Sequence, residues 1–277
     1  MKSLKHIRIA VSLIMFGECA LWALTGLSAP VHARLAVSVQ LTPAVAMAGV
    51  GATLAGGLLW LLVTFLLGRV YCSAFCPLGV LQDGVIRLRS LFGRKRRRFS
   101  YRKSNNRRFL MLGIYAGAMV AAIGCVPLLL EPLPAFINAL SVASFHGPHP
   151  ALKGLGVGAA LGTVCAVVSM LGILCYSFFW GRDFCNEVCP VGTVLRLVGN
   201  RSVVHIELEP DKCTACLKCQ DVCKASCIDI KTRTIDNGPC VRCFDCLAVC
   251  DDDALHFTID RNGVASPLFQ RRRSLTP

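Results

Sequence analysis

The chain contains the stretch Cys213-Thr-Ala-Cys216-Leu-Lys-Cys219-Gln-Asp-Val-Cys223 and, further on, Cys240-Val-Arg-Cys243-Phe-Asp-Cys246-Leu-Ala-Val-Cys250. Both runs have the spacing C-x2-C-x2-C-x3-C, in which closely spaced thiolates hold a [4Fe–4S] cluster. A zinc ribbon is the alternative for such cysteines, but it needs two separated pairs rather than two quartets. The two runs therefore predict a small α+β, ferredoxin-like domain with two [4Fe–4S] clusters.

The ligands of the two clusters follow from the usual exchange of the fourth cysteine between such runs. Proline usually follows that cysteine, but here Lys224 and Asp251 stand in its place. Cys227 is a further thiol nearby, and we interpret it as a small packing residue before a strand at Ile228, with a ligand role as the alternative. We assign one cluster to Cys213, Cys216, Cys219 and Cys250, and the other to Cys240, Cys243, Cys246 and Cys223.

The composition indicates a membrane protein. The 277 residues are 54% hydrophobic, and the mean hydropathy of +0.57 is too high for a soluble domain. A secretory signal peptide is the alternative for the first apolar stretch, but this stretch is longer than a signal peptide's apolar core. Four stretches are long enough to span: about Ile9 to Ala29, Ala44 to Gly68, Phe109 to Leu130 and Leu155 to Trp180.

The formal charge of +14 is unevenly distributed along the chain. Eleven of the 30 Lys and Arg residues lie between Arg87 and Arg108, whereas eleven of the 16 acids lie between Glu207 and Asp260. No signature of a nucleic-acid-binding fold accompanies the charge, so we expect no nucleic-acid partner. A basic loop beside apolar spans marks the cytoplasmic side and attracts anionic lipid. We therefore expect the N-terminus, this loop and the ferredoxin domain to be cytoplasmic.

The apolar part contains an internal repeat. Gly68-Arg-Val-Tyr-Cys72-Ser-Ala-Phe-Cys76-Pro-Leu-Gly79 returns as Gly181-Arg-Asp-Phe-Cys185-Asn-Glu-Val-Cys189-Pro-Val-Gly192. Two parallel helical hairpins would bring both motifs together, and proline after the second cysteine suits the start of a helix capped by that cysteine. Helix N-termini favour thiolates. A metal, a further cluster, redox-active dithiols or four structural thiols all remain open for Cys72, Cys76, Cys185 and Cys189.

With these motifs, nearly the whole chain resembles the NapH/MauN group of membrane polyferredoxins, which are related to NosR-type regulators and to polyferredoxins of cytochrome oxidase assembly. The resemblance implies an electron-transfer component of a quinol dehydrogenase in the bacterial inner membrane, linked to the quinone pool rather than a stand-alone enzyme. It implies a redox partner such as a periplasmic ferredoxin-type subunit, a multihaem cytochrome or a reductase.

Glu18 is the acid inside the first apolar stretch. Intramembrane acids are costly and often functional, so Glu18 is a candidate proton acceptor at a quinol site, with a neutral packing role as the alternative. A second function remains open for the chain. An accessory factor could supply electrons or metal for the assembly of another redox enzyme, with the four repeated thiols as its working groups.

The predicted architecture joins a four-helix, all-α membrane part made of two repeated hairpins to the ferredoxin domain. The expected divisions are a first hairpin at 1–86, the basic loop at 87–108, a second hairpin at 109–200, the ferredoxin domain at 201–260 and a disordered tail at 261–277.

Overall fold

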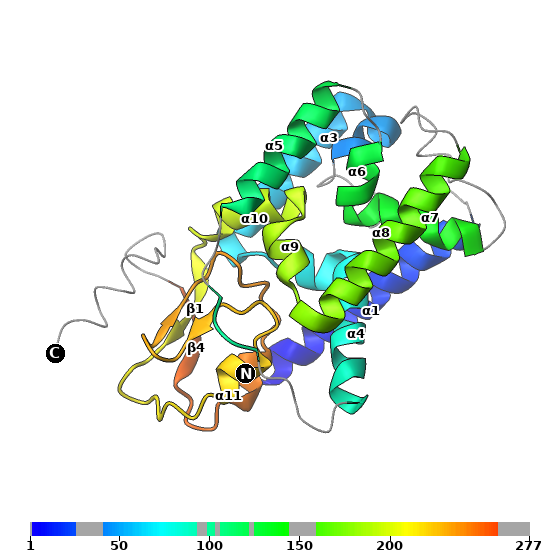
Figure 1. The fold of residues 1–277 in the computed structure, drawn as a ribbon. Helices are drawn as coiled ribbons and strands as arrows, with labels where there is room; N and C mark the ends of the chain where they lie inside the picture. Colours follow the sequence, from blue (N-terminus) through cyan, green and yellow to red (C-terminus); the bar gives the residue numbers. More distant parts are fainter. Residues whose placement is uncertain are drawn as a thin grey trace.

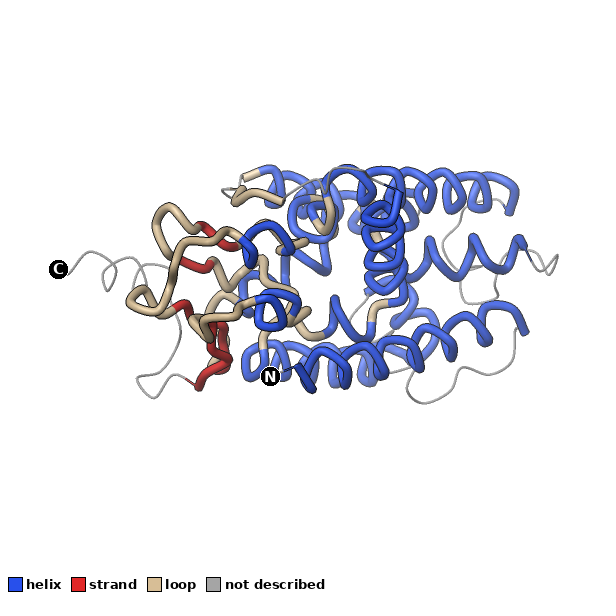
Figure 2. Tube along the Cα trace, turned by 90° about the horizontal axis from the view of Figure 1, so that it is seen from below, coloured by secondary structure: helices blue, strands red, loops and turns tan. Residues whose placement is uncertain are grey.

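The structure is a computed structural model that describes residues 2–25, 41–92, 99–102, 106–121, 125–143 and 159–259. Helices form one end of the molecule, and short strands and loops form the other, as Figures 1 and 2 show. The N-terminus lies at the junction between the two parts (Figure 1). There Lys5 forms an ion pair with Asp245 at 2.9 Å.

The first copy of the repeat follows two long helices, α1 (Lys2–Thr25) and α3 (Leu41–Leu67). A single π-helical turn, η1 (Tyr71–Phe75), precedes α4 (Pro77–Phe92). Helix α3 coincides closely with the predicted second span. Residues 26–29 of the predicted first span lie outside the described residues.

The predicted third span is wrong as a single helix. The segment forms α5 (Arg107–Val120) and α6 (Cys125–Leu130), and α7 (Pro132–Ala143) follows where we expected an open connection. Proline is accepted in the first turn of a helix but disrupts a helix interior, so Pro127 and Pro132 suit the starts of two short helices. Both prolines lie in the first turn of their helix.

The second copy of the repeat follows α8 (Ala159–Trp180), which agrees with the predicted fourth span over its described residues. Helices α9 (Asp183–Glu187) and α10 (Pro190–Gly199) then lead to the strands. Helix α7 packs against α1 and α8, and its residues Leu133, Ala135, Phe136 and Ile137 are buried. It therefore fills the centre of the helical part.

Among the described residues, Ser3–Thr25 within α1 is the one helix that is long and apolar enough to cross a membrane. The apolar segments Leu54–Leu67 of α3 and Val164–Trp180 of α8 are shorter. Four membrane-spanning helices therefore stay a prediction.

The ferredoxin-like part has two small antiparallel sheets. Strand β1 (Val204–Leu208) pairs with β4 (Leu255–Ile259), and β2 (Ile228–Asp229) pairs with β3 (Thr234–Ile235). The sequence also predicts strands near Val203 to Glu207, Ile228 to Ile230 and Ala254 to Thr258, and these are confirmed to within a residue. Strand β3 was not predicted. Two short helices, α11 (Lys218–Val222) and α12 (Asp245–Val249), each begin inside a cysteine run.

Candidate iron–sulfur centre

The two cysteine runs adopt the same local conformation. The residues on either side of the second cysteine of each run have left-handed backbones. In the first run φ is 54° at Ala215 and 65° at Leu217, and in the second run it is 54° at Arg242 and 60° at Phe244. Such conformations are uncommon outside glycine. In both runs they curl the chain around the first three cysteines before α11 or α12 begins.

The fold gathers the eight cysteines into two sets. Each set lines a small cavity and takes three cysteines from one run and the fourth from the other, which is the exchange that the spacing predicted. Four thiols around a cavity are a suitable donor set for a [4Fe–4S] cluster, and the ligand roles remain a proposal. The sets are Cys213, Cys216, Cys219 and Cys250 in one cavity, and Cys223, Cys240, Cys243 and Cys246 in the other.

Cys227 lines the second cavity together with these four cysteines. Its thiol is 3.3 Å from the Cys223 thiol, and its backbone N–H donates to the Cys223 Sγ at 3.5 Å. The pKa of Cys240 is lowered to about 5, chiefly by a hydrogen bond from Cys227. Burial raises this pKa, and the positive charge of Arg242 lowers it further. Cys227 therefore contacts the second cysteine set directly, which sequence spacing alone did not indicate.

The two copies of the Cys-x3-Cys-Pro repeat also share a conformation. Gly68 and Gly181 have φ of +80° and +67°, values that glycine adopts without strain. Cys189 caps α10 as predicted and accepts a hydrogen bond from the Gly192 N–H at 3.4 Å. The Gly79 N–H makes the equivalent bond to Cys76.

Two fully buried arginines cross between the copies. Arg69 of the first copy donates to the Cys185 carbonyl at 3.0 Å, and Arg182 of the second donates to the Cys72 carbonyl. Gly79 and Gly192 leave the space for this exchange. A Cβ on Gly192 would lie 2.0 Å from the Cys185 oxygen and 3.0 Å from Arg69 Nη2. The arginine of each copy is thus hydrogen-bonded to the other copy, and the glycine after each Cys-Pro leaves the space for these contacts.

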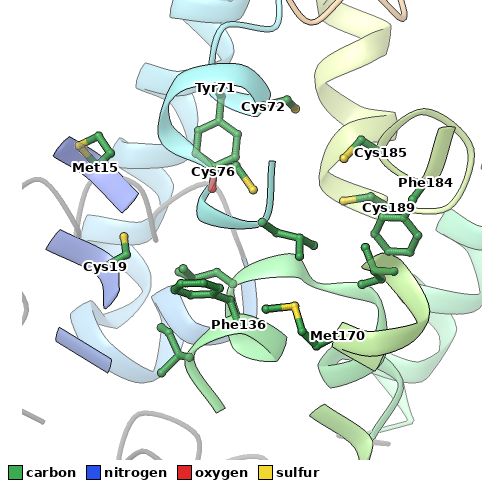
Figure 3. Packing of buried hydrophobic residues seen from close by; sticks show 14 of the residues in the cluster. Met15, Cys19, Tyr71, Cys72, Cys76, Phe136, Met170, Phe184, Cys185 and Cys189 are labelled. Carbon is green, nitrogen blue, oxygen red and sulfur yellow. The ribbon is translucent and has the colours of Figure 1, made fainter. Parts of the chain in front are cut away.

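Cys72, Cys76, Cys185 and Cys189 all lie in one buried cluster, which we call the four-thiol core (Figure 3). Arg69 Nη2 is 3.6 Å from the Cys72 thiol, and the Cys185 thiol donates to Gln82 Oε1 at 3.2 Å. Within the part of the chain that the structure describes, no three or more His, Cys, Asp or Glu side chains are arranged to hold a single metal ion. The additional metal predicted here gains no support from this geometry.

The second cysteine set lies directly against the four-thiol core. Val241 is buried in the same cluster as the four thiols, and Cys243 packs against that cluster. Arg242 is fully buried and donates to the Leu67 carbonyl at the end of α3. The Arg182 N–H donates to the Lys224 carbonyl at 2.9 Å. Lys224, which replaces the usual proline, therefore joins the ferredoxin domain to the helices.

Asp83 on α4 is the centre of the charges at this junction. It pairs with Arg8 at 3.0 Å, Arg182 at 2.9 Å and Lys224 at 3.3 Å. Burial alone would raise the pKa of Asp83, but Arg182, Lys224 and Arg8 outweigh burial and hold the pKa well below its usual range. Sequence reasoning missed Asp83, and its signal was modest: a single acid in a helix that follows Cys-Pro.

The remaining predicted positions lie elsewhere. Glu18 is half-buried on α1, beside Cys19, which is buried in the same cluster as the four thiols. The basic loop is described only in part. Its Phe99 and Arg102 backbone N–H groups donate to the Asp221 and Ser226 carbonyls, at 3.3 and 3.1 Å, so this part of the loop contacts the ferredoxin domain.

Comparison with known proteins identifies similar iron–sulfur proteins. A family described as "4Fe-4S binding domain" matches residues 50–99 and 164–207. The methylamine utilization ferredoxin-type protein MauN of Paracoccus denitrificans is 31% identical over 207 residues, covering 74% of this chain and 64% of MauN. The chain is similar to the MauN/NapH-type ferredoxin proteins.

Other relatives extend the comparison. An uncharacterized protein of Methanocaldococcus jannaschii is 29% identical over 209 residues, covering 75% of this chain and 71% of the relative. The putative electron transport protein YccM of Escherichia coli is 25% identical over 199 residues, 69% of this chain and 51% of YccM. No solved structure matches. The chain is thus a ferredoxin-type 4Fe–4S electron-transfer protein.

The position of the family match along the chain is informative. Its two segments contain the two Cys-x3-Cys-Pro motifs and end before Cys213, the first of the eight ferredoxin cysteines. The description "4Fe-4S binding domain" therefore falls on the halves of the four-thiol core rather than on the ferredoxin domain.

Proposed function

We propose that this protein is the membrane component of a quinol dehydrogenase, which takes electrons from membrane quinol and delivers them to a respiratory partner. The observation that carries the proposal is the order of the cysteine sites. The four-thiol core lies within the helices, the Cys243 set packs against it, and the Cys216 set lies beyond, with Cys216 exposed. This order provides a route from the helices to the surface.

The helical part supports a membrane location. Helices α3 and α8 contain 27 and 22 residues, compared with the roughly 20 that a span requires. Large apolar side chains are exposed along α1, α3 and α8, among them Leu13, Leu58 and Leu171 at 60%, 67% and 62%. Such faces are unfavourable in water and suit lipid. These faces support our proposal of a multi-pass protein of the bacterial inner membrane, in which the N-terminus and the ferredoxin domain are cytoplasmic.

The residues have distinct roles in this proposal. The eight ferredoxin cysteines hold two [4Fe–4S] clusters, each of which supplies one-electron transfer when bound. Arg242 and Lys224 fix the nearer set against the helices, and Arg69 and Arg182 place positive charge beside the four thiols. We extend the proposal to a further cluster at the four-thiol core, which the position of the family match supports.

The partner binds at the exposed set in this proposal. Asp251, Asp252 and Asp253 are exposed beside Cys250, so a redox partner with a basic surface suits this end. A periplasmic partner needs a further subunit, such as a multihaem cytochrome or a ferredoxin-type protein, to complete the path across the membrane.

The test is electron paramagnetic resonance on the full chain in membranes, first with a menaquinol analogue and then with dithionite. Quinol should reduce a [4Fe–4S] cluster and so produce its resonance signal. Cys72→Ala or Cys185→Ala should slow this electron transfer, while dithionite still produces the signal of the ferredoxin clusters. If only dithionite produces the signal, the chain alone is not quinol-linked. An accessory factor that supplies electrons or metal for the assembly of another redox enzyme then becomes the better description.

A further inference from the structure

A cavity of about 230 Å³ lies between α3, α5 and α10. Its walls are almost entirely apolar. The Trp60 and Tyr115 side chains are buried, with only 6% and 7% of their surface exposed. Val194 on its rim is 38% exposed, so the cavity opens to the outside of the helical part. The lining residues are Gly57, Trp60, Leu61, Leu112, Tyr115, Pro190, Val191, Val194 and Leu195.

The cavity has one hydroxyl in its lining, which belongs to Tyr115. That hydroxyl donates a hydrogen bond to Glu131, whose side chain is fully buried between α6 and α7. A phenol held by a carboxylate can also accept a hydrogen bond from a ligand, because its oxygen carries two lone pairs. The apolar cavity therefore has a fixed polar group in its wall.

The cavity also adjoins the four-thiol core from both copies of the repeat. Pro190 in its wall directly follows Cys189. Trp60 packs edge-on against Tyr71 and Phe75, with ring centroids 5.0 and 4.7 Å apart, and these two residues flank Cys72 and Cys76. The cavity wall is thus connected to the thiol-bearing segments of both copies through chain neighbours and ring contacts.

We infer that this cavity binds the ring of a membrane quinone, with a ring oxygen hydrogen-bonded to Tyr115 and the isoprenoid tail leaving past Val194. The inference rests on the proposed quinol link and gives it a site. The volume is below the roughly 300–1,000 Å³ of pockets that enclose a whole drug-sized ligand, which suits a ring whose tail stays outside. An acyl chain needs neither the hydroxyl nor the aromatic walls. Glu18 does not line this cavity.

The test measures binding rather than turnover. A photoreactive azidoquinone is cross-linked to the full chain in lipid nanodiscs, and peptides are mapped with and without an excess of a short-chain menaquinone analogue. Label should fall on α3, α5 or α10 and be displaced by the analogue. Label that falls elsewhere, or that the analogue does not displace, overturns the inference, and displacement by a fatty acid alone identifies an acyl-chain site.

Two variants and a matched control sharpen the result. Val191→Trp fills the cavity and should abolish the specific label, whereas Val164→Trp adds the same side chain on an exposed face of α8 and should not. Tyr115→Phe should weaken binding of the analogue about threefold to tenfold, the loss of one hydrogen bond. Equal labelling of the two tryptophan variants contradicts the inference.

The two proposals fail in different ways. If Val191→Trp abolishes labelling but quinol never reduces the clusters of the unmodified chain, the ring site stands and the electron-transfer proposal falls. If quinol reduces the clusters equally well in Val191→Trp, the quinol link stands and this cavity is not its site. Retained [4Fe–4S] signals under dithionite show that each variant has folded.

Discussion

At the residue scale, the repeat is explained by space around two backbone carbonyls. Gly79 and Gly192 lie where a Cβ would come within 2.2 and 2.0 Å of the Cys72 and Cys185 oxygens. Both carbonyls accept hydrogen bonds from the arginine of the other copy. Glycine is therefore required at these two positions because a carbonyl oxygen lies too close for a side chain, and not because of the backbone φ angle.

Gly192→Ala should destabilise the protein by about 1–3 kcal/mol, because the added methyl group displaces the Cys185 turn and Arg69. Gly84→Ala is the matched control in α4, since a Cβ there meets nothing within 4 Å. It should be neutral or stabilise by up to about 1 kcal/mol. Thermal unfolding in detergent compares the two variants, and equal midpoints for Gly192→Ala and Gly84→Ala would contradict this explanation.

Cys227→Ala should keep both clusters, because four other cysteines complete its cavity. Cys223→Ala removes one of those four and should lose the iron of one cluster. Iron content per chain and the dithionite-reduced resonance spectrum measure this difference. Loss of iron in Cys227→Ala would make Cys227 a ligand rather than a neighbour that donates a hydrogen bond.

At the scale of elements, α7 is the helix that organises the others. Phe136 is 1% exposed and contacts Phe16 of α1, with ring centroids 5.4 Å apart. Aromatic residues at such positions contribute both buried area and shape. Helix α7 therefore holds the first hairpin against the second.

Phe136→Ala should cost about 3–5 kcal/mol, the usual loss for a truncated core aromatic residue. Leu171→Ala on α8 is the comparison, because Leu171 is 62% exposed. It should change the unfolding midpoint in detergent little. A similar loss for both variants would show that α7 is not the central contact.

At the scale of the whole molecule, Asp83 links α1, the second repeat and the ferredoxin domain through Arg8, Arg182 and Lys224. Asp83→Asn should cost about 3–5 kcal/mol, because it removes the counter-charge of Arg8 and the buried Arg182, whereas Lys224 keeps Asp245. Asp251→Asn, in the exposed pair with Lys218, should leave the thermal midpoint unchanged. An Asp83→Asn midpoint equal to that of the parent would contradict the central role of Asp83.

The same carboxylate predicts a pH dependence. Its pKa in the folded protein lies below the ordinary 3.8, so its stabilisation is complete above that pH and is lost as the pH falls further. Unfolding midpoints measured from pH 7 to pH 3 should decline below about pH 4 in the parent. Asp83→Asn should lack this part of the decline, and an identical profile would contradict the assignment.

The sequence by itself determined the two cysteine runs, their paired fourth cysteines, the repeat and most of the long helices, because spacing and apolar length are local properties. It missed the division of the third span between α5 and α6 and the helix α7 that begins at Pro132, since a uniformly apolar sequence does not show where one helix ends and the next begins. Only the tertiary structure decided that Arg69 and Arg182 exchange between copies, that Asp83 joins the two parts and that Tyr115 meets Glu131. Those contacts join residues far apart in the chain, and their partners are fixed by packing rather than by local pattern.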